Sequence, residues 1–267
     1  MTDFVNVESL NFRSAPVVDD ATLNGPLFLG HAVTPTGAVD ANGFVPVDTV
    51  FGRGMKSGFV AARFLRKAVS DGREALIAAA VEQWLRFDRG QGLEHVSPYF
   101  RFVGEMWDAI GIDLDGRDRG VPWSAAAISF VVRQAAAKHA LYKKFKFSDG
   151  HARYIHDSIV KRDAGDTNTP FWGFRITERK PQLGDLICKN RGDGITFDIA
   201  KRTDQFRSHC DVVIAIDSPN NKLLALGGNV SQSFETTEYR LAPGDFLAAL
   251  TPSGSTVFAL LANRNDP

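Results

Sequence analysis

The sequence has few cysteines and no excess of charge of either sign. Among its 267 residues only Cys188 and Cys210 carry thiols, which excludes a disulfide scaffold and a zinc site built from paired CxxC motifs. We expect two buried thiols or one optional bridge. Lysine plus arginine and aspartate plus glutamate total 31 each, so the net charge gives no general attraction to nucleic acid or to acidic membranes.

Long apolar runs are also missing. The N-terminal stretch MTDFVNVESLNFRS is acidic and alternates polar with apolar residues, unlike the basic and apolar regions of a secretion signal. No run approaches the roughly 18 apolar residues that cross a bilayer. We therefore expect synthesis in the cytoplasm without a signal peptide, no membrane span, and action at the cell wall or periplasm only after lysis or injection.

The patterns that are present divide the chain in two. Residues 1–68 hold short alternating runs, such as 4–7 and 43–47, separated by turn residues, which predicts a small β-barrel. From Asp71 onward apolar residues recur at helical spacing. The stripe comprises Leu76, Ile77, Ala80, Val81, Trp84 and Leu85.

Further helices are predicted from Ser97-Pro98 to Gly111, from Ser124, and from Ser148 or Asp149 through Arg162. The remainder predicts strands at 186–189, 210–217, 222–226 and 257–262, with a hairpin turn at 218–221. Helices followed by a meander of strands indicate an α+β domain over residues 69–267.

Four N-terminal segments occur in an order and spacing that resemble bacterial SH3-like cell-wall-binding domains: 10–16 (LNFRSAP), 29–33 (LGHAV), 43–47 (GFVPV) and 58–65 (GFVAARFL). The resemblance implies an SH3-like β-barrel over residues 1–68 that binds wall material. Phe44 and Phe59 stand where the family usually has tryptophan. These rings either cover a ligand by stacking or fill the barrel core.

Four later segments, 122–131 (PWSAAAISFV), 181–187 (PQLGDLI), 208–213 (SHCDVV) and 227–230 (GGNV), resemble papain-like amidases and peptidases of the CHAP and NlpC types. The resemblance covers roughly Trp84 to Arg264 and implies a domain whose N-terminal helices pack on an antiparallel sheet. Ser124 stands where those families have cysteine. The pattern also resembles an uncharacterised bacterial branch in which serine is usual.

The resemblance implies a catalytic role for three residues: Ser124 as nucleophile, His209 as general base and acid, and Asn229 as the group that orients His209. A helix N-terminus favours an anion and offers N–H groups to an oxyanion, which suits a nucleophile. Strand alternation places His209 and Asp211 on one face and Cys210 on the other, so Asp211 competes with Asn229 and Cys210 is a poor nucleophile.

Substrate-binding candidates are Trp123, His151, Tyr154 and Asp211. His151 and Tyr154 can share one helix face at i and i+3 and line a cleft. Trp123 is either a cleft wall or a core aromatic. Ser124 has a structural alternative too, because serine often caps a helix.

The function that these resemblances imply is peptidoglycan hydrolysis by an amidase or endopeptidase, without a cofactor, as an endolysin or a delivered antibacterial toxin. A toxin would need a secretion apparatus and an immunity protein as partners. Three interpretations of Ser124 stay open: a natural nucleophile, an engineered replacement of cysteine, or a lineage that lost catalysis. An alkanol is far harder to ionise than a thiol and depends wholly on its base.

Two other classes of function are compatible with the sequence. A non-catalytic wall-binding component of a phage tail or toxin predicts binding to sacculi without release of product. A zinc-dependent wall hydrolase would use His151, His209 and Asp211 as ligands, although no HExxH motif is present.

Overall fold

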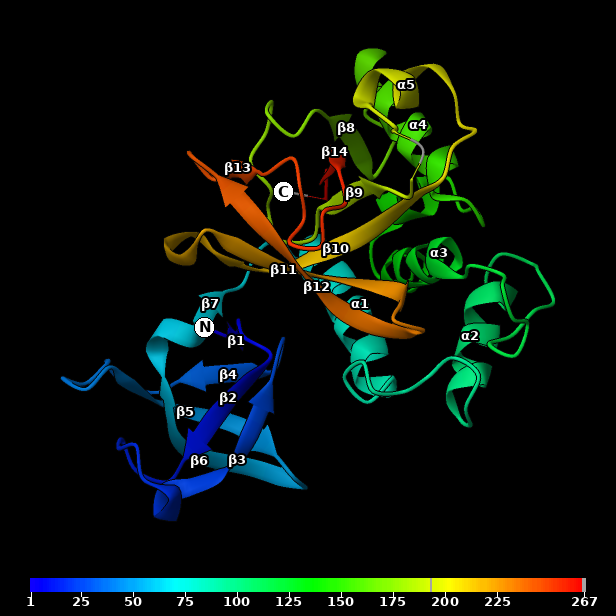
Figure 1. The fold of residues 1–267 in the computed structure, drawn as a ribbon. Coiled ribbons are helices and arrows are strands. Elements are labelled where there is room, and N and C mark those ends of the chain that lie inside the picture. The colour runs from blue at the N-terminus through cyan, green and yellow to red at the C-terminus, as the bar shows by residue number, and fades with distance from the viewer. Residues whose placement is uncertain (193, 266–267) are drawn as a thin grey trace. The chain divides into compact units, whose positions relative to one another are not determined.

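A computed structural model describes residues 1–192 and 194–265, and it shows two compact units, Met1–Val69 and Ser70–Pro267 (Figure 1). Helices and antiparallel sheets both contribute, so the fold is α+β, as the sequence predicts. Within the described part of the chain, no helix combines the length and the apolar character needed to cross a membrane.

The first unit is an antiparallel sheet in the order β3-β2-β6-β5-β4-β1-β7. Its strands are β1 (Asp3–Val5), β2 (Ser9–Arg13), β3 (Leu23–Phe28), β4 (Ala32–Pro35), β5 (Phe44–Phe51), β6 (Gly54–Ala61) and β7 (Leu65–Lys67). Apolar side chains from most of these strands form one core. Phe44 is buried and Phe59 half-buried, so the two rings differ in their access to a ligand.

The second unit places helices on a sheet in the order β13-β12-β11-β10-β9-β14-β8 (Figure 1). The helices are α1 (Asp71–Arg86), α2 (Tyr99–Asp108), α3 (Ser124–Ala136), α4 (His151–Asp163) and α5 (Phe197–Arg202). The strands are β8 (Phe171–Phe174), β9 (Leu186–Asn190), β10 (Ser208–Asp217), β11 (Lys222–Val230), β12 (Ser233–Ala242), β13 (Phe246–Leu247) and β14 (Val257–Asn263).

Helix α1 begins where the apolar period predicts, although its N-cap is Ser70, whose hydroxyl accepts the N–H of Arg73. The predicted stripe is buried apart from Leu85, which is 46% exposed. Helix α2 likewise begins one residue after Pro98, which is the N-cap and not the first helical residue. Propensity and capping therefore locate the starts of these helices to within a residue or two, whereas α2 ends at Asp108, before the predicted end at Gly111.

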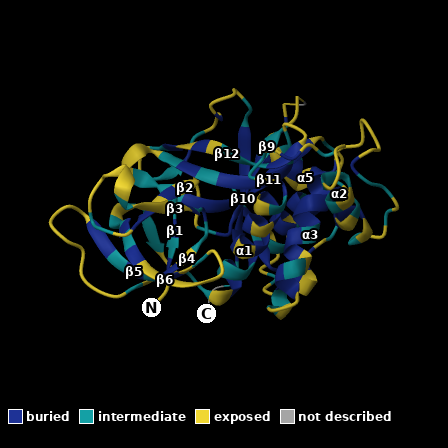
Figure 2. Ribbon diagram, turned by 90° about the horizontal axis from the view of Figure 1, so that it is seen from below, coloured by how far each residue is buried: buried dark blue, intermediate teal, exposed yellow. Residues whose placement is uncertain are grey.

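Helix α3 is the central helix of the second unit. It packs against α1 and α2 and against strands β10 and β11. Most of its residues are buried, as are the middle strands of the sheet (Figure 2). The run of small residues Ala125, Ala126 and Ala127 allows this close packing, since each presents only a methyl group to its neighbours.

A buried ion pair fastens α1 to the sheet. The Arg73 guanidinium lies 2.8 Å from Asp185 Oδ1 and also donates to the carbonyls of Leu183 and Asn263. Both charged side chains are almost completely buried. Burial acts to raise the pKa of Asp185, whereas the Arg73 charge opposes that shift.

We expect Arg73→Met to lower the free energy of unfolding by about 3–5 kcal/mol, because it leaves a buried carboxylate without its counter-charge. Lys222→Met is the matched control, since Lys222 and Glu238 are both exposed and such pairs contribute about 0–1 kcal/mol. Urea denaturation of both variants measures the difference. Equal losses in the two would contradict the structural role of the buried pair.

Candidate functional site

The site begins at the first residue of α3. Ser124 is 3% exposed, and its Oγ lies 2.7 Å from Nε2 of His151. The N-cap position belongs to Trp123, and no side-chain capping bond is made there. The structure therefore differs from the alternative in which Ser124 serves only as a cap, because its hydroxyl is directed to an imidazole.

His151 is the first residue of α4, so two helix starts meet at this contact. Tyr154 lies one turn further along α4, and its hydroxyl contacts Nδ1 of His151. Burial raises the pKa of Tyr154, and the thiol of Cys210, which lies near the same hydroxyl, acts in the same direction. The tautomer with the proton on Nδ1, which donates it to the Tyr154 hydroxyl, leaves Nε2 to accept the proton of Ser124.

A second histidine pair lies on β10. His209 Nε2 is 2.7 Å from Asp211 Oδ1, which agrees with the strand alternation that places both on one face. The other carboxylate oxygen of Asp211 accepts from Lys189 on β9 at 3.0 Å and from the hydroxyl of Tyr239 on β12 at 2.5 Å. Asp211 is completely buried, so these three donors compensate for its lost hydration.

Two glycines on β11 make room for the site. A Cβ on Gly227 would lie 1.8 Å from Asp211 Oδ1 and 3.1 Å from His209 Nε2. A Cβ on Gly228 would lie 2.4 Å from the Cβ of Ala127 on α3. Real Cβ atoms do not approach so closely, so both glycines are required by packing.

The structure brings together five of the seven residues predicted for the site, but in different pairs: Ser124, His151, Tyr154, His209 and Asp211. Within the described structure no hydrogen bond joins Ser124 to His209; the partner of Ser124 is His151. The predicted orienting residue Asn229 lies in the left-handed region at a β-bulge (φ 57°), and its carbonyl accepts from Arg191 at 3.4 Å. Asp211, the competing candidate, holds His209 instead.

The backbone at Asn229 explains why this residue does not orient His209 as predicted. The bulge between Gly228 and Val230 interrupts the alternation of β11, so the position of the Asn229 side chain no longer follows from its place along the strand. Arg191 also lies 3.5 Å from His209 Nδ1, the ring nitrogen that Asp211 does not bind. Asp211, two residues along β10, orients His209. That role was predicted for the side-chain amide of Asn229 on β11.

The two histidines lie close together, with ring centroids 5.2 Å apart. Burial lowers the pKa of His151 well below its ordinary value, and the neighbouring His209 acts in the same direction, while Asp211 opposes the shift. Burial also lowers the pKa of His209 despite the opposing effect of Asp211. Burial acts against ionisation of Asp211 as well, but His209 and Lys189 together keep its pKa below the usual range.

Trp123 belongs to the core. It is 1% exposed, stacks on Phe87 with ring centroids 5.6 Å apart, and donates its indole N–H to Glu94 at 2.5 Å. This arrangement corresponds to the core alternative and not to a cleft wall. Cys188 and Cys210 are buried free thiols that face each other across β9 and β10, with their sulfur atoms 3.0 Å apart.

Metal binding is not supported by the geometry of the described residues, among which no group of three or more His, Cys, Asp or Glu side chains could hold an ion. His151 and His209 point their Nε2 atoms at Ser124 and Asp211 respectively, so the ligand set considered for zinc does not converge on one point.

Sequence reasoning missed Lys189, Tyr239 and Glu94. Lys189 is directly opposite His209 in the register of β9 and β10, and Tyr239 comes from a strand that is not adjacent to β10. An alternating pattern predicts that a strand exists but not which residue faces which partner. Of these three residues only Lys189 is indicated by the sequence pattern, because it is the polar last residue of the apolar strand predicted at 186–189.

Comparison with known proteins gives one family. A family model described as "Uncharacterized protein conserved in bacteria (DUF2272)" matches residues 99–258. No curated protein matches the sequence. Among solved structures, NlpC2 from Trichomonas vaginalis is similar at 13% identity and a TM-score of 0.31, over 97% of this chain and 72% of that one. NlpC1 from the same organism is similar at 12% identity and a TM-score of 0.30, over 98% and 70%.

We expect the free energy of unfolding to fall as the pH is lowered from 7.5 to 5.5. His151 stays neutral in the folded protein because burial lowers its pKa, whereas a histidine in the unfolded chain protonates near pH 6.5. The unfolded state therefore gains protons first, and each such proton costs about 1.4 kcal/mol of stability per pH unit below that value.

Urea denaturation at several pH values measures this slope. We expect His151→Gln to remove the share of one proton from this slope. A His151→Gln variant with the parent's slope would show that His151 already takes up a proton in the folded state at these pH values.

Proposed function

This chain belongs to the DUF2272 family, and from the side chains gathered at Ser124 we propose that it is a peptidoglycan-directed amide hydrolase with a papain-like catalytic domain. The observation that carries the proposal is the 2.7 Å contact between a serine hydroxyl at the start of α3 and a buried, neutral imidazole. The sequence resemblance to CHAP and NlpC-type enzymes supports the choice of wall peptide as substrate.

In the proposed reaction, Ser124 Oγ attacks the carbonyl carbon of the scissile amide while its proton passes to His151 Nε2. The carbonyl oxygen becomes an oxyanion, and backbone N–H groups of the first turn of α3, which have no partner within the helix, can donate hydrogen bonds to it. His151 then protonates the leaving amine as the C–N bond breaks. A water molecule then attacks the acyl carbon and gives its proton to His151, and His151 returns this proton to Ser124 Oγ as the bond to serine breaks and the carboxylic acid leaves.

His151 must carry a positive charge between these steps, and its surroundings bear on that charge. The bond from Nδ1 to Tyr154 keeps the ring in the tautomer whose Nε2 accepts a proton. Burial and the neighbouring His209 lower the pKa of His151, and the ionised carboxylate of Asp211 acts against that shift and in favour of the imidazolium. His209 is held by that carboxylate beside His151, and we assign it a positioning role in place of the base role predicted from the sequence.

A second candidate function is supported by burial. Ser124 and His151 are 3% and 5% exposed, which favours a structural pair inside a wall-binding component over a site open to a large polymer. In either case we assign wall binding to the first unit, on its resemblance to SH3-like domains, with half-buried Phe59 the better placed of the two phenylalanines to meet a ligand.

Digestion of purified sacculi separates the two functions. We expect the parent protein to release amines or peptides identifiable by mass, and Ser124→Ala to lower the rate by about a thousandfold or more, because the nucleophile is lost. His156→Ala is the matched control, since His156 lies on α4 but, among the described residues, hydrogen-bonds the carbonyl of Ala200 and no residue of the Ser124 site. Sacculi that sediment with the protein yet stay intact would support the binding component and contradict hydrolysis.

The same assay distinguishes the roles of His151 and His209. We expect His151→Gln to reduce hydrolysis about as strongly as Ser124→Ala, because residues that act as a unit do not contribute additively. His209→Gln should retain measurable turnover with an altered pH profile, since it disturbs the electrostatics around His151 without removing the base. The reverse order of effects would restore His209 as the general base.

A further inference from the structure

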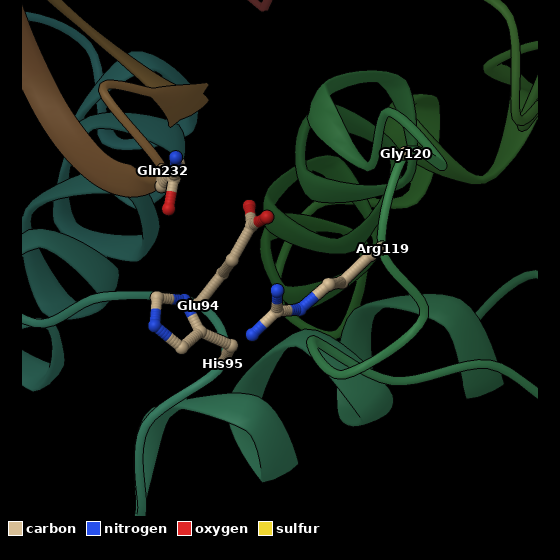
Figure 3. A pocket seen from close by; sticks show the side chains of 5 residues that line it. All are labelled: Glu94, His95, Arg119, Gly120 and Gln232. Atoms are coloured by element: carbon tan, nitrogen blue, oxygen red, sulfur yellow. The ribbon is translucent and has the colours of Figure 1, made fainter.

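A pocket of about 290 Å³ lies at the end of α3 that carries Ser124. Its lining comes from three separate segments (Figure 3): Glu94 and His95 from the link between α1 and α2, Arg119 and Gly120 from the loop before α3, and Gln232 from the turn between β11 and β12. None of these residues takes part in the Ser124 contacts described above.

Glu94 is fixed in place and joins the pocket to the catalytic helix. Its Oε2 accepts the indole N–H of Trp123, the residue before Ser124, and its own N–H donates to the carbonyl of Gln232 at 2.7 Å. Its carbonyl packs so tightly against Gly116 that a Cβ there would lie 1.9 Å from the oxygen. The carboxylate is therefore held by its surroundings, and its Oε1 is left for another donor.

Arg119 is positioned differently from its neighbour Arg117. Arg117 binds the Asp115 carboxylate at 2.5 Å and lies over the ring of Phe100. Arg119 makes no hydrogen bond or ion pair with any residue that the structure describes, and its side chain extends into the pocket beside Glu94 (Figure 3). Glu94 and Arg119 thus present opposite charges to one small space without pairing to each other.

These two charges select the ligand. An anion such as phosphate would meet the Glu94 carboxylate, and a simple cation would meet the Arg119 guanidinium, so each would be repelled by one wall. A ligand carrying both an ammonium and a carboxylate satisfies both walls. A volume near 290 Å³ is at the lower limit of small-molecule sites and suits one amino-acid unit better than a glycan strand.

We propose that this pocket binds an amino-acid head group, with its carboxylate on Arg119, its ammonium on Glu94 Oε1, and the Gln232 amide as a further polar contact. The inference rests on the proposed function, because stem peptides that end or branch in such a group are the substrates that would use it. Trp123 then couples substrate recognition to the start of α3, where Ser124 would attack.

The test uses the full chain with Ser124→Ala, so that no turnover occurs, and alanine as the probe. We expect alanine to shift the backbone amide signals of Gly120 and Gln232 in a saturable manner in NMR titrations. Propionate and ethylamine, which carry only one of the two charges, should give no saturable shift at the same concentrations. A response to propionate or ethylamine equal to that of alanine would overturn the proposal.

Variants locate the site. We expect Arg119→Gln and Glu94→Gln each to weaken alanine binding by about tenfold or more, because each removes one charge-assisted contact. Arg117→Gln, in the same loop but paired with Asp115, should bind alanine like the parent. Unchanged alanine binding in Arg119→Gln would also overturn the proposal. This variant should fold normally, because Arg119 is exposed and has no partner among the described residues.

Failure of this inference and failure of the proposed function are distinguishable. Alanine binding is measured without the Ser124 hydroxyl, so a protein that leaves sacculi intact but binds alanine through Arg119 loses the hydrolase assignment and keeps the pocket. A protein that hydrolyses sacculi through Ser124 but does not bind alanine keeps the hydrolase assignment and loses the pocket.

Discussion

The carboxylate of Asp211 is the constraint on which the second unit's site depends. It is completely buried, and an isolated charge in such a place would be strongly unfavourable. Its stability there requires His209, Lys189 and Tyr239 at once, and these come from three different strands. The register of β9 on β10 and the glycine at position 227 follow from the same requirement, since a side chain on β11 would occupy the place of the carboxylate oxygen.

The charge of Asp211 acts on the uncharged pair formed by Ser124 and His151. Ser124 and His151 meet because two helices begin at the same point, and burial removes the water that would otherwise favour a charged imidazole. The charge of Asp211 opposes that effect, although the carboxylate binds His209 and not His151. The buried carboxylate therefore lowers the free-energy cost of a transient positive charge on His151 without contacting it directly in the described structure.

The sequence predicts the local elements well and their contacts poorly. Apolar periodicity locates α1 and α3, and alternation along β10 correctly predicts the pairing of His209 with Asp211. The contact of Ser124 with His151 joins residues 27 positions apart on two helices, and no local pattern encodes how those helices pack. The bulge at Asn229 had a similar effect, because one extra residue in a strand changes which side chain faces the site.

The same physics bears on why a serine stands at the start of α3. A cysteine nucleophile works as a thiolate beside a charged imidazole, and such an ion pair needs an environment that stabilises both charges. Here burial favours the neutral form of His151, which is the form that a serine hydroxyl needs in its base. In the proposed reaction, these surroundings suit an alkanol nucleophile that a neutral base activates.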